Sequence, residues 1–318
     1  MAQLHVPTRS ASSPRGALPV DRAGALLQVH PASVTNAATR LEAAGLVVRS
    51  TARRGVTDRS VPDDLGTAVP LPTPPRRVVS LVPSLTEALA VTVPDRLVGA
   101  TDWCTHPAWL ADDPAVSRVR GTKNPDRAAI EALRPDLVVA NQEENRRLDV
   151  ERLRAAGVPV WVTVIESVDQ ALASMRRLFA DVLAVGTPEW LRTATAEWGR
   201  PPELPGTRVA VPVWRDPWMV VGARTSTGDV LARLGLVNVL AGSPDRYPHV
   251  ALEELLAAGP ELVLLPDEPY LFTADDGPEA FPGTPSVLIS GRQLTWYGPS
   301  LATARSELVA AVGRRPVT

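Results

Sequence analysis

The chain has 318 residues, of which 45% are hydrophobic and 21% charged, and its formal net charge is −2. This composition is typical of globular proteins, and the length corresponds to about two domains. The near-neutral charge excludes a general affinity for nucleic acid or anionic membranes, and the single cysteine excludes an internal disulfide and a cysteine-rich zinc site.

Residues 1–20 are polar and lack the apolar run of about seven or more residues that a secretory signal requires. No stretch reaches the roughly 18 consecutive apolar residues of a membrane-spanning helix. We therefore expect a cytoplasmic protein that is not inserted in a membrane.

Residues 1–60 predict a partial winged helix-turn-helix. Two helices are expected at Asp21–Val29 and Ala32–Ala44, and Gly45 is suited to end the second. Two short apolar runs then flank an arginine-rich bend, which is typical of a β-ribbon wing. The string LQVHPASVTNAATRLEAAGLVVRSTARRGVTDRS resembles the DNA-reading segment of the MarR family of regulators.

This resemblance implies DNA contacts in the major groove and in the wing. However, the leading helices and the long dimerisation helices of that family are missing, and reading a duplex half-site normally needs a dimer. Two interpretations are therefore open. The segment is either a working DNA-binding element, or it is a truncated remnant or the result of a start codon chosen too far upstream. The implied DNA contacts are Ser33, Thr35, Asn36 and Arg40 in the groove and Arg53 or Arg54 in the wing.

Residues 61–75 (VPDDLGTAVPLPTPP) predict a proline-rich, extended linker. Strand-like and helical runs alternate after it, which favours an α/β fold with a mostly parallel sheet. Residues 76–166 form the first expected lobe. Its strands are expected at Val78–Val82, Leu97–Ala100, Asp136–Ala140 and Val158–Val164, and its helices at Leu85–Val91, Pro125–Leu133 and Glu144–Ala156.

The first helix of this lobe carries a capping signal. Ser84 is a favourable N-cap, and Glu87 stands three residues further on, which together predict a capping box.

Residues 167–200 predict a helical connection that Gly186-Thr187-Pro188 interrupts, and residues 201–318 predict a second lobe. The segments Arg134–Leu137 and Gly259–Leu262 match each other, so the two lobes follow a similar plan. The second lobe's strands are expected at Val209–Val213, Trp218–Val221, Leu262–Leu265 and Val287–Ile289, and its helices at Ser226–Leu234, Ala251–Ala258 and Ser300–Val312.

With both lobes in view, residues 76–312 resemble the helical-backbone metal receptor superfamily. These are the class III substrate-binding proteins of ABC importers for cobalamin, iron-siderophores and heme, and the cobalamin type is the most similar. The matching strings are RVVSLVPSLTEAL, LVGATDWCTHP, GTKNPDRAAIEALRPDLVVA, AGVPVWVT and YPHVALEELLAAGPELVLLPDEPY.

The resemblance implies two Rossmann-like α/β lobes joined by a single long backbone helix, with the ligand held in a cleft between the lobes. It implies that Trp103 lines the cleft. It also implies that Asp126 and Glu253 present one carboxylate from each lobe to arginines of an ABC permease, although Asp126 is one methylene shorter than the usual Glu.

Several aromatic residues fall at predicted strand ends or in the loops that follow. A large, flat and mostly apolar ligand such as a corrin or a porphyrin requires aromatic walls and a few polar anchors. The alternative is that loop tryptophans only plug the edges of the lobes. The aromatic candidates at these places are Trp103, Trp214, Trp218, Trp296 and Tyr297, and Tyr247 is a further ligand-binding candidate.

Two charged residues are candidate polar anchors. Arg215 stands between two tryptophans in VWRDPW and could bind a carboxylate or phosphate of the ligand in bidentate fashion; a local ion pair with Asp216 is the alternative. Glu268 follows a predicted strand and could contact a polar edge of the ligand, or it could simply belong to a turn that Pro266 and Pro269 dictate.

Cys104 and His106 lie two residues apart in one loop, a pair that suits zinc, cobalt or copper. His249 and Tyr247 of the second lobe could complete the set of ligands across the cleft. Two ligands in one loop form only part of a closed metal site, which has four. His106 or His249 is therefore also a candidate axial ligand to the metal of a tetrapyrrole, and a buried thiol with a hydrogen-bonded imidazole is the alternative.

No nucleophile–base pair, phosphate-binding glycine loop or HExxH motif is present. We therefore expect a non-catalytic protein without a required cofactor that binds cobalamin or a related tetrapyrrole, metal chelate or siderophore. A ligand-responsive transcriptional regulator that uses the N-terminal segment is the alternative, and an enzyme that inserts metal into tetrapyrroles is a third.

Overall fold

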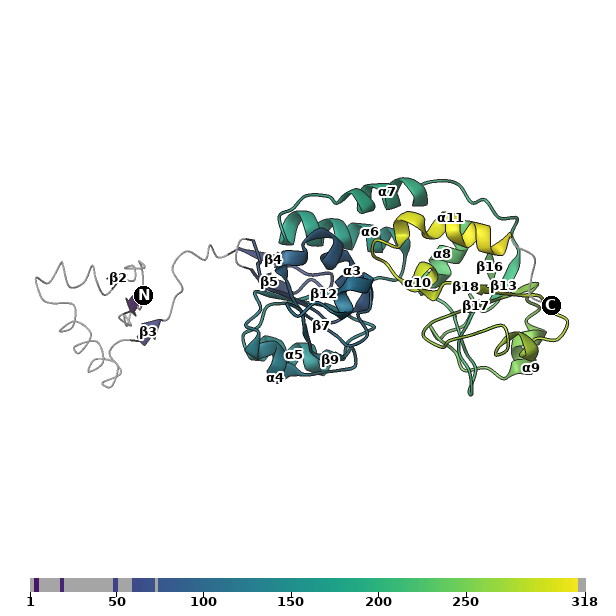
Figure 1. Ribbon diagram of the computed structural model, residues 1–318, viewed down its shortest axis with the longest axis horizontal. Coiled ribbons are helices and arrows are strands. Elements are labelled where there is room, and N and C mark those ends of the chain that lie inside the picture. Colours follow the sequence, from purple (N-terminus) through teal and green to yellow (C-terminus); the bar gives the residue numbers. More distant parts are fainter. Residues whose placement is uncertain (1–2, 6–17, 20–47, 51–58, 72–73, 314–318) are drawn as a thin grey trace, which may run out of the picture. The chain divides into compact units, whose positions relative to one another are not determined.

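The computed structural model describes residues 3–5, 18–19, 48–50, 59–71 and 74–313 (Figure 1). The chain divides into two compact units, Met1–Thr57 and Asp58–Thr318.

In the first unit, three short strands pair antiparallel. β1 (Gln3–His5) lies between β2 (Leu18–Pro19) and β3 (Val48–Ser50). Both predicted helices of this unit lie outside the described residues, as do the side chains to which we assigned DNA contacts. The winged helix-turn-helix therefore remains a prediction.

A β-hairpin occupies most of the segment predicted to be an extended linker, so that prediction is wrong for residues 61–71. β4 (Ser60–Pro62) pairs antiparallel with β5 (Ala68–Pro70), and Val69 and Leu71 are buried in the apolar core of the second unit. The turn is fastened to the first lobe, since the Asp63 carboxylate accepts a 2.6 Å hydrogen bond from Arg154. The hydrogen bonds of Asp63, rather than the prolines around it, determine the conformation of this turn.

The first lobe is built on five parallel strands in the order β12-β11-β6-β7-β8. The edge strand β8 was not predicted. The strands are β6 (Val78–Ser80), β7 (Leu97–Ala100), β8 (Ser117–Arg118), β11 (Leu137–Asn141) and β12 (Val160–Thr163); the helices are α3 (Pro83–Thr92), α4 (Arg127–Ala132) and α5 (Arg147–Ala155), with 3-10 turns at Pro94–Arg96 and Ala108–Ala111 and a small hairpin of β9 (Arg120–Gly121) and β10 (Asn124–Pro125).

The predicted capping box of α3 is absent. The helix begins at Pro83, and Val82 in the N-cap position provides no side-chain hydrogen bond. Ser84 and Glu87 are instead buried, and the Glu87 carboxylate pairs with Arg292 of the other lobe. The prediction failed because a partner distant in sequence competes for the same carboxylate.

The connection between the lobes consists of two helical segments rather than one continuous helix. α6 (Val168–Arg176) continues into a π-helical turn at Arg177–Val182, and α7 (Glu189–Trp198) follows after an interruption. Gly186 lies in that interruption with φ of 76°, a conformation that glycine adopts without strain.

The second lobe has four parallel strands in the order β16-β13-β17-β18. The predicted strand Val209–Val213 is divided, and its second part pairs antiparallel with β15 outside the main sheet. The strands are β13 (Arg208–Ala210), β14 (Pro212–Trp214), β15 (Met219–Val220), β16 (Val237–Asn238), β17 (Leu262–Pro266) and β18 (Ser286–Ile289); the helices are α8 (Ser226–Leu234), α9 (Leu252–Ala257), α10 (Gly291–Thr295) and α11 (Leu301–Val312), with a 3-10 turn at Pro278–Ala280.

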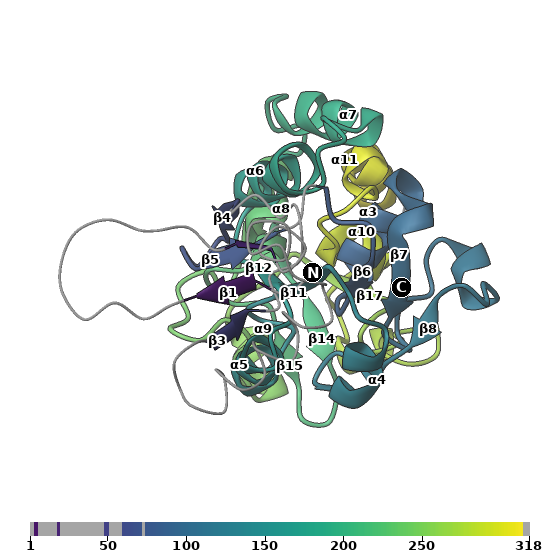
Figure 2. The same ribbon diagram turned by 90° about the vertical axis from the view of Figure 1, so that its left-hand side faces the viewer.

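One apolar core runs through both lobes and the connection. Leu137 and Val139 of β11 belong to it, whereas Val138 and Ala140 point to the other face of the sheet and pack in a separate cluster with residues of α4 and α5. Buried residues of α6, α7 and α11 complete the shared core. Figures 1 and 2 show these three helices on one side of the sheets and α4, α5 and α9 on the other.

Within the part of the chain that the structure describes, no helix combines the length and the apolar character needed to cross a bilayer.

We predict that replacing Asp63 by Ala destabilises the protein. Asp63 is 2% exposed, and besides Arg154 its carboxylate accepts hydrogen bonds from the backbone N–H groups of Leu65 and Thr67. Breaking a buried ion pair by removing one partner costs about 3 kcal/mol. Urea denaturation measures this loss.

The control is Glu189→Gln, which removes an ion pair with Arg192. The side chain of Glu189 is 79% exposed. We expect a change below about 0.5 kcal/mol for this variant. Equal losses for the two variants would show that the hairpin is not fastened to the lobe through Asp63.

Candidate ligand-binding site

Loops that follow the parallel strands of the two lobes contact each other. In open α/β sheets, ligands bind outside the carboxyl ends of the strands, so these loops form the candidate site. In the first lobe these loops carry Glu143, after β11, and Glu166, after β12. In the second lobe Arg246 lies in the loop before α9, and Arg292 lies in α10, which follows β18.

Arg246 links two strand ends of the first lobe. Its Nη2 lies 2.6 Å from Oε2 of Glu143, and its Nη1 pairs with Glu166. The neighbouring Tyr247 is half-buried, and burial together with the adjacent Glu143 carboxylate raises the pKa of its hydroxyl. These contacts join the lobes by charge as well as by apolar packing.

A second contact between the lobes involves Glu87. Only 4% of its side chain is exposed, and one carboxylate oxygen pairs with Arg292 while the other has no hydrogen-bond partner. Tyr297, which lies close to Arg292 in the sequence, is buried. This burial raises the pKa of its hydroxyl well above the usual value.

His106 and Trp296, both predicted site residues, meet across the boundary between the lobes. Their ring centroids are 5.4 Å apart in an edge-on arrangement. Trp296 also lies close to Glu268, and burial raises the pKa of that carboxyl. Oε1 of Glu268 is buried without a partner. The structure therefore brings three of the predicted residues into one group.

Arg215 and Trp218 stabilise a loop within the second lobe. Arg215 pairs with Asp276 and with Glu279, and its guanidinium carbon lies 5.4 Å from the ring centroid of Trp218. Trp218 is 9% exposed and stacks on Phe272 with an interplanar angle of 2°. The guanidinium is thus already occupied, mainly by partners other than the predicted Asp216, which lies 3.7 Å away.

Trp103 and Trp214 present the most accessible aromatic surface among the predicted residues. Trp103 is 68% exposed and follows β7, and its indole lies beside Gly121, where a Cβ would approach Nε1 to 3.2 Å. Trp214 ends β14, is 45% exposed and packs edge-on against Tyr270 at 5.7 Å. One exposed indole thus comes from each lobe.

The metal site considered from Cys104, His106 and His249 is contradicted. Cys104 is fully buried in the core between hydroxyls of Thr86 at 3.0 Å and Thr101 at 3.1 Å, and burial raises the pKa of its thiol. Within the described residues, no group of three or more His, Cys, Asp or Glu side chains could hold a metal ion. Spacing in one loop misled the prediction because Cys104 is buried in the core, whereas His106 is partly exposed and packs against Trp296.

Asp126 and Glu253 each lie at the N-terminal end of a helix, one in each lobe. Asp126 is the N-cap of α4 and accepts a hydrogen bond from the backbone N–H of Ala129, while its carboxylate lies 3.6 Å from Arg120. Glu253 is exposed in the first turn of α9. Both helices lie on the side of the sheets away from α7 (Figure 1).

Sequence reasoning missed most of the charged residues that join the lobes. Glu143 lies in a polar run after a predicted strand, a position that signals proximity to the site. Arg246 and Arg292 carry no such signal, because their partners are at least 80 residues away.

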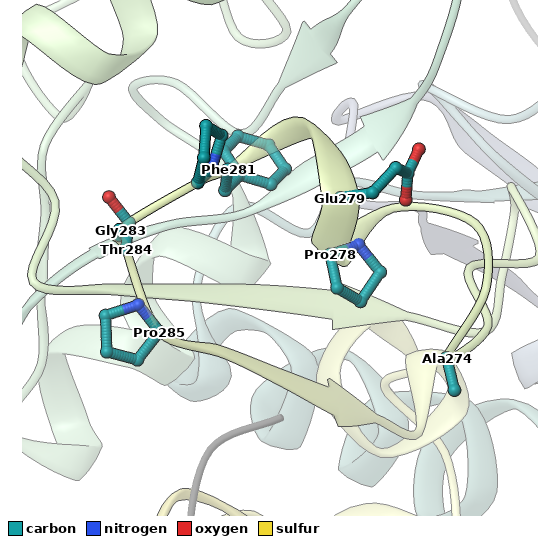
Figure 3. A pocket seen from close by; sticks show the side chains of 8 residues that line it. Ala274, Pro278, Glu279, Phe281, Gly283, Thr284 and Pro285 are labelled. Carbon is teal, nitrogen blue, oxygen red and sulfur yellow. The ribbon is translucent and has the colours of Figure 1, made fainter. Parts of the chain in front are cut away.

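A hollow of about 480 Å³ lies in the second lobe but not between the lobes (Figure 3). Pro278, Phe281 and Pro285 are among its lining residues, and its wall also includes Glu279. None of the predicted ligand-binding residues lines it, so it does not coincide with the candidate site.

No family model matches the chain. The chain is 24% identical over 206 residues to a vitamin B12-binding protein of Pectobacterium carotovorum, an alignment that spans 61% of this chain and 72% of the relative. It shares the fold of the periplasmic vitamin B12-binding protein of Vibrio cholerae, with a TM-score of 0.61, 19% identity and coverage of 75% and 97%. It is also similar to a periplasmic heme-binding protein in complex with two hemes, with a TM-score of 0.62, 25% identity and coverage of 74% and 97%.

These comparisons confirm the predicted fold, two α/β lobes with parallel sheets. They contradict the expected cytoplasmic location, because the solved structures of the same fold belong to periplasmic proteins. That expectation rested on the polar residues 1–20, and most of these lie outside the described residues.

We predict that Glu268→Gln stabilises the protein at neutral pH. Because the pKa of this buried carboxyl is raised in the folded state, the folded protein binds more protons than the unfolded protein between the two pKa values. The carboxylate therefore penalises folding more as the pH rises through the folded pKa. The amide lacks this penalty, so the variant's advantage should vanish as the pH falls below the ordinary value of 4.5.

Thermal or urea denaturation between acidic and neutral pH measures this difference. Glu131→Gln on α4 removes an exposed carboxylate and serves as the control, for which we expect no pH-dependent gain. A loss of stability in Glu268→Gln at neutral pH would show that the charged carboxylate is required there.

Proposed function

We propose that this protein is a non-catalytic binding protein that holds cobalamin, or a related tetrapyrrole or metal chelate, between its two lobes. The main support is the meeting of strand-end loops from both lobes, which brings His106 and Trp296 within 5.4 Å and adds an exposed indole from each lobe. The similarity to vitamin B12-binding and heme-binding proteins favours this class of ligand.

Within the site, Trp103 and Trp214 would provide aromatic surface for the flat face of the ligand. Trp is well suited to this because it offers a large apolar area with few rotatable bonds. His106, Tyr247 and Trp296 would contact the ligand between these walls, with Glu268 as a polar anchor behind Trp296. Trp218, Arg215 and Tyr297 would act indirectly, by holding the loops and the boundary between the lobes in place.

The alternative of a ligand-responsive transcriptional regulator gains nothing from the described residues, and the similar proteins are binding proteins. We therefore propose no DNA-binding function.

We predict that Trp103→Ala weakens the binding of cyanocobalamin about tenfold or more, the loss expected for a well-packed aromatic anchor. Tryptophan fluorescence quenching measures the affinity, with hemin and a ferric siderophore as competing ligand classes. Trp109→Ala is the matched control, since Trp109 is 47% exposed in the same lobe. We expect the control to change the affinity less than about twofold.

If none of the three ligands quenches the fluorescence below about 100 μM, the proposed function is refuted. That concentration corresponds to a binding free energy of about −5.5 kcal/mol. Equal losses in the two variants would instead refute the assignment of Trp103 while leaving the ligand class standing.

We also propose that Asp126 and Glu253 dock the protein on an ABC permease. Reversing the charge with Glu253→Arg should lower transport of cobalamin by the cognate permease in proteoliposomes at least about tenfold, because like charges at an interface are strongly unfavourable. The affinity for cobalamin should stay unchanged. Glu307→Arg on α11, an exposed position on the other side of the sheets, is the control; an equal effect there would exclude specific docking through Glu253.

A further inference from the structure

The charged contacts between the lobes form a distinct group, which we call the interlobe seam and define as Glu87, Glu143, Glu166, Arg246 and Arg292. We infer that Arg246 and Arg292 act as a reversible latch that holds the two lobes together when no ligand is bound. Arg246 is the principal positioning residue, because it spans two strand ends of the first lobe.

The direction of the charges supports this inference. Both arginines belong to the second lobe and all three carboxylates belong to the first, so every ion pair of the seam crosses the boundary between the lobes. Separating the lobes would break all of these pairs at once. It would also leave Glu143 and Glu166 facing outward without their shared cation.

The helical connection leaves a role for such a latch. It is interrupted between the π-helical turn ending at Val182 and the start of α7 at Glu189, so it is not one rigid rod. The shared apolar core holds the lobes at the side of α6, α7 and α11. The seam lies at the strand ends, where the lobes would separate to admit a ligand.

Unsatisfied polar atoms in the seam indicate that the latch is reversible. Nε of Arg246, Nε of Arg292 and Oε2 of Glu87 are buried without hydrogen-bond partners. A permanent interface normally satisfies its buried polar groups, since each unsatisfied one is costly. When the seam opens, water can satisfy these atoms, which offsets part of the loss of the ion pairs.

The ion pairs of Arg246 are also accessible to solvent. Its side chain is 28% exposed, and those of Glu143 and Glu166 are 35% and 40% exposed. Partly exposed pairs of this kind are weak, so removing Arg246 should decrease the ratio of closed to open molecules roughly three- to tenfold.

The distance between the lobes in the ligand-free protein tests the latch. Cysteines introduced at Ala128 on α4 and Ala257 on α9, both exposed, allow spin labelling, while the native Cys104 is fully buried. Electron–electron double resonance then measures the label separation. In the Arg246→Gln background we expect a second population whose distance is longer by more than about 2 Å, a shift larger than that of rigid complexes.

Arg147→Gln is the matched control, since it removes one arginine and one ion pair that lies wholly within α5. It should leave the distance distribution unchanged. The double variant Arg246→Glu with Glu143→Arg restores one pair in reversed order and should recover the shorter distance. An Arg246→Gln distribution identical to that of the parent protein would overturn the inference.

Salt provides a second measurement if Arg246→Gln does not fold. Raising NaCl from about 0.05 M to about 1 M screens partly exposed charges and should move the parent protein toward the longer distance. An unchanged distance at high salt, with Arg246→Gln unable to fold, would also overturn the latch. These measurements use no ligand, so they stand or fall separately from the proposed binding of cobalamin.

Discussion

The shared apolar core beneath α6, α7 and α11 is the constraint on which the rest of the structure depends. The strands β6, β11, β12 and β17 are buried along their whole length, and in both lobes one face of the sheet contributes to this core. Because the lobes are held together on that side, their strand ends are brought to a common boundary. Every charged or aromatic contact between the lobes follows from that placement.

The boundary differs in character from the core that creates it. Carboxylates from the first lobe meet arginines from the second, and several of their atoms lack partners. Apolar packing thus provides permanent attachment on one side, while charge provides a weaker contact where a ligand would enter. This division suits a protein that has to hold a ligand and release it.

Elements that depend on residues close in sequence were predicted more accurately than contacts between residues far apart in sequence. The strand at Leu97–Ala100 and the helix at Ser226–Leu234 were predicted with their observed bounds, because local apolar patterns and caps determine them. Prediction failed for the Glu87 capping box, the proline-rich linker and the metal ligands. In the first two cases a carboxylate pairs with an arginine distant in sequence, Arg292 for Glu87 and Arg154 for Asp63. In the third, Cys104 is buried between the hydroxyls of Thr86 and Thr101.

The sequence by itself determined the alternation of strands and helices, the two-lobed plan and the class of residues at the strand ends. These can be recognised from the periodicity of apolar residues and from motif strings, without knowing which residues contact each other. Only the tertiary structure decided which of those residues meet: it paired His106 with Trp296, occupied Arg215 within its own lobe and buried Cys104. The physical reason is that the packing of the chain decides which environment a side chain meets and which distant partner it contacts, as in the pairs Arg246–Glu143 and Arg292–Glu87, and no local pattern encodes this.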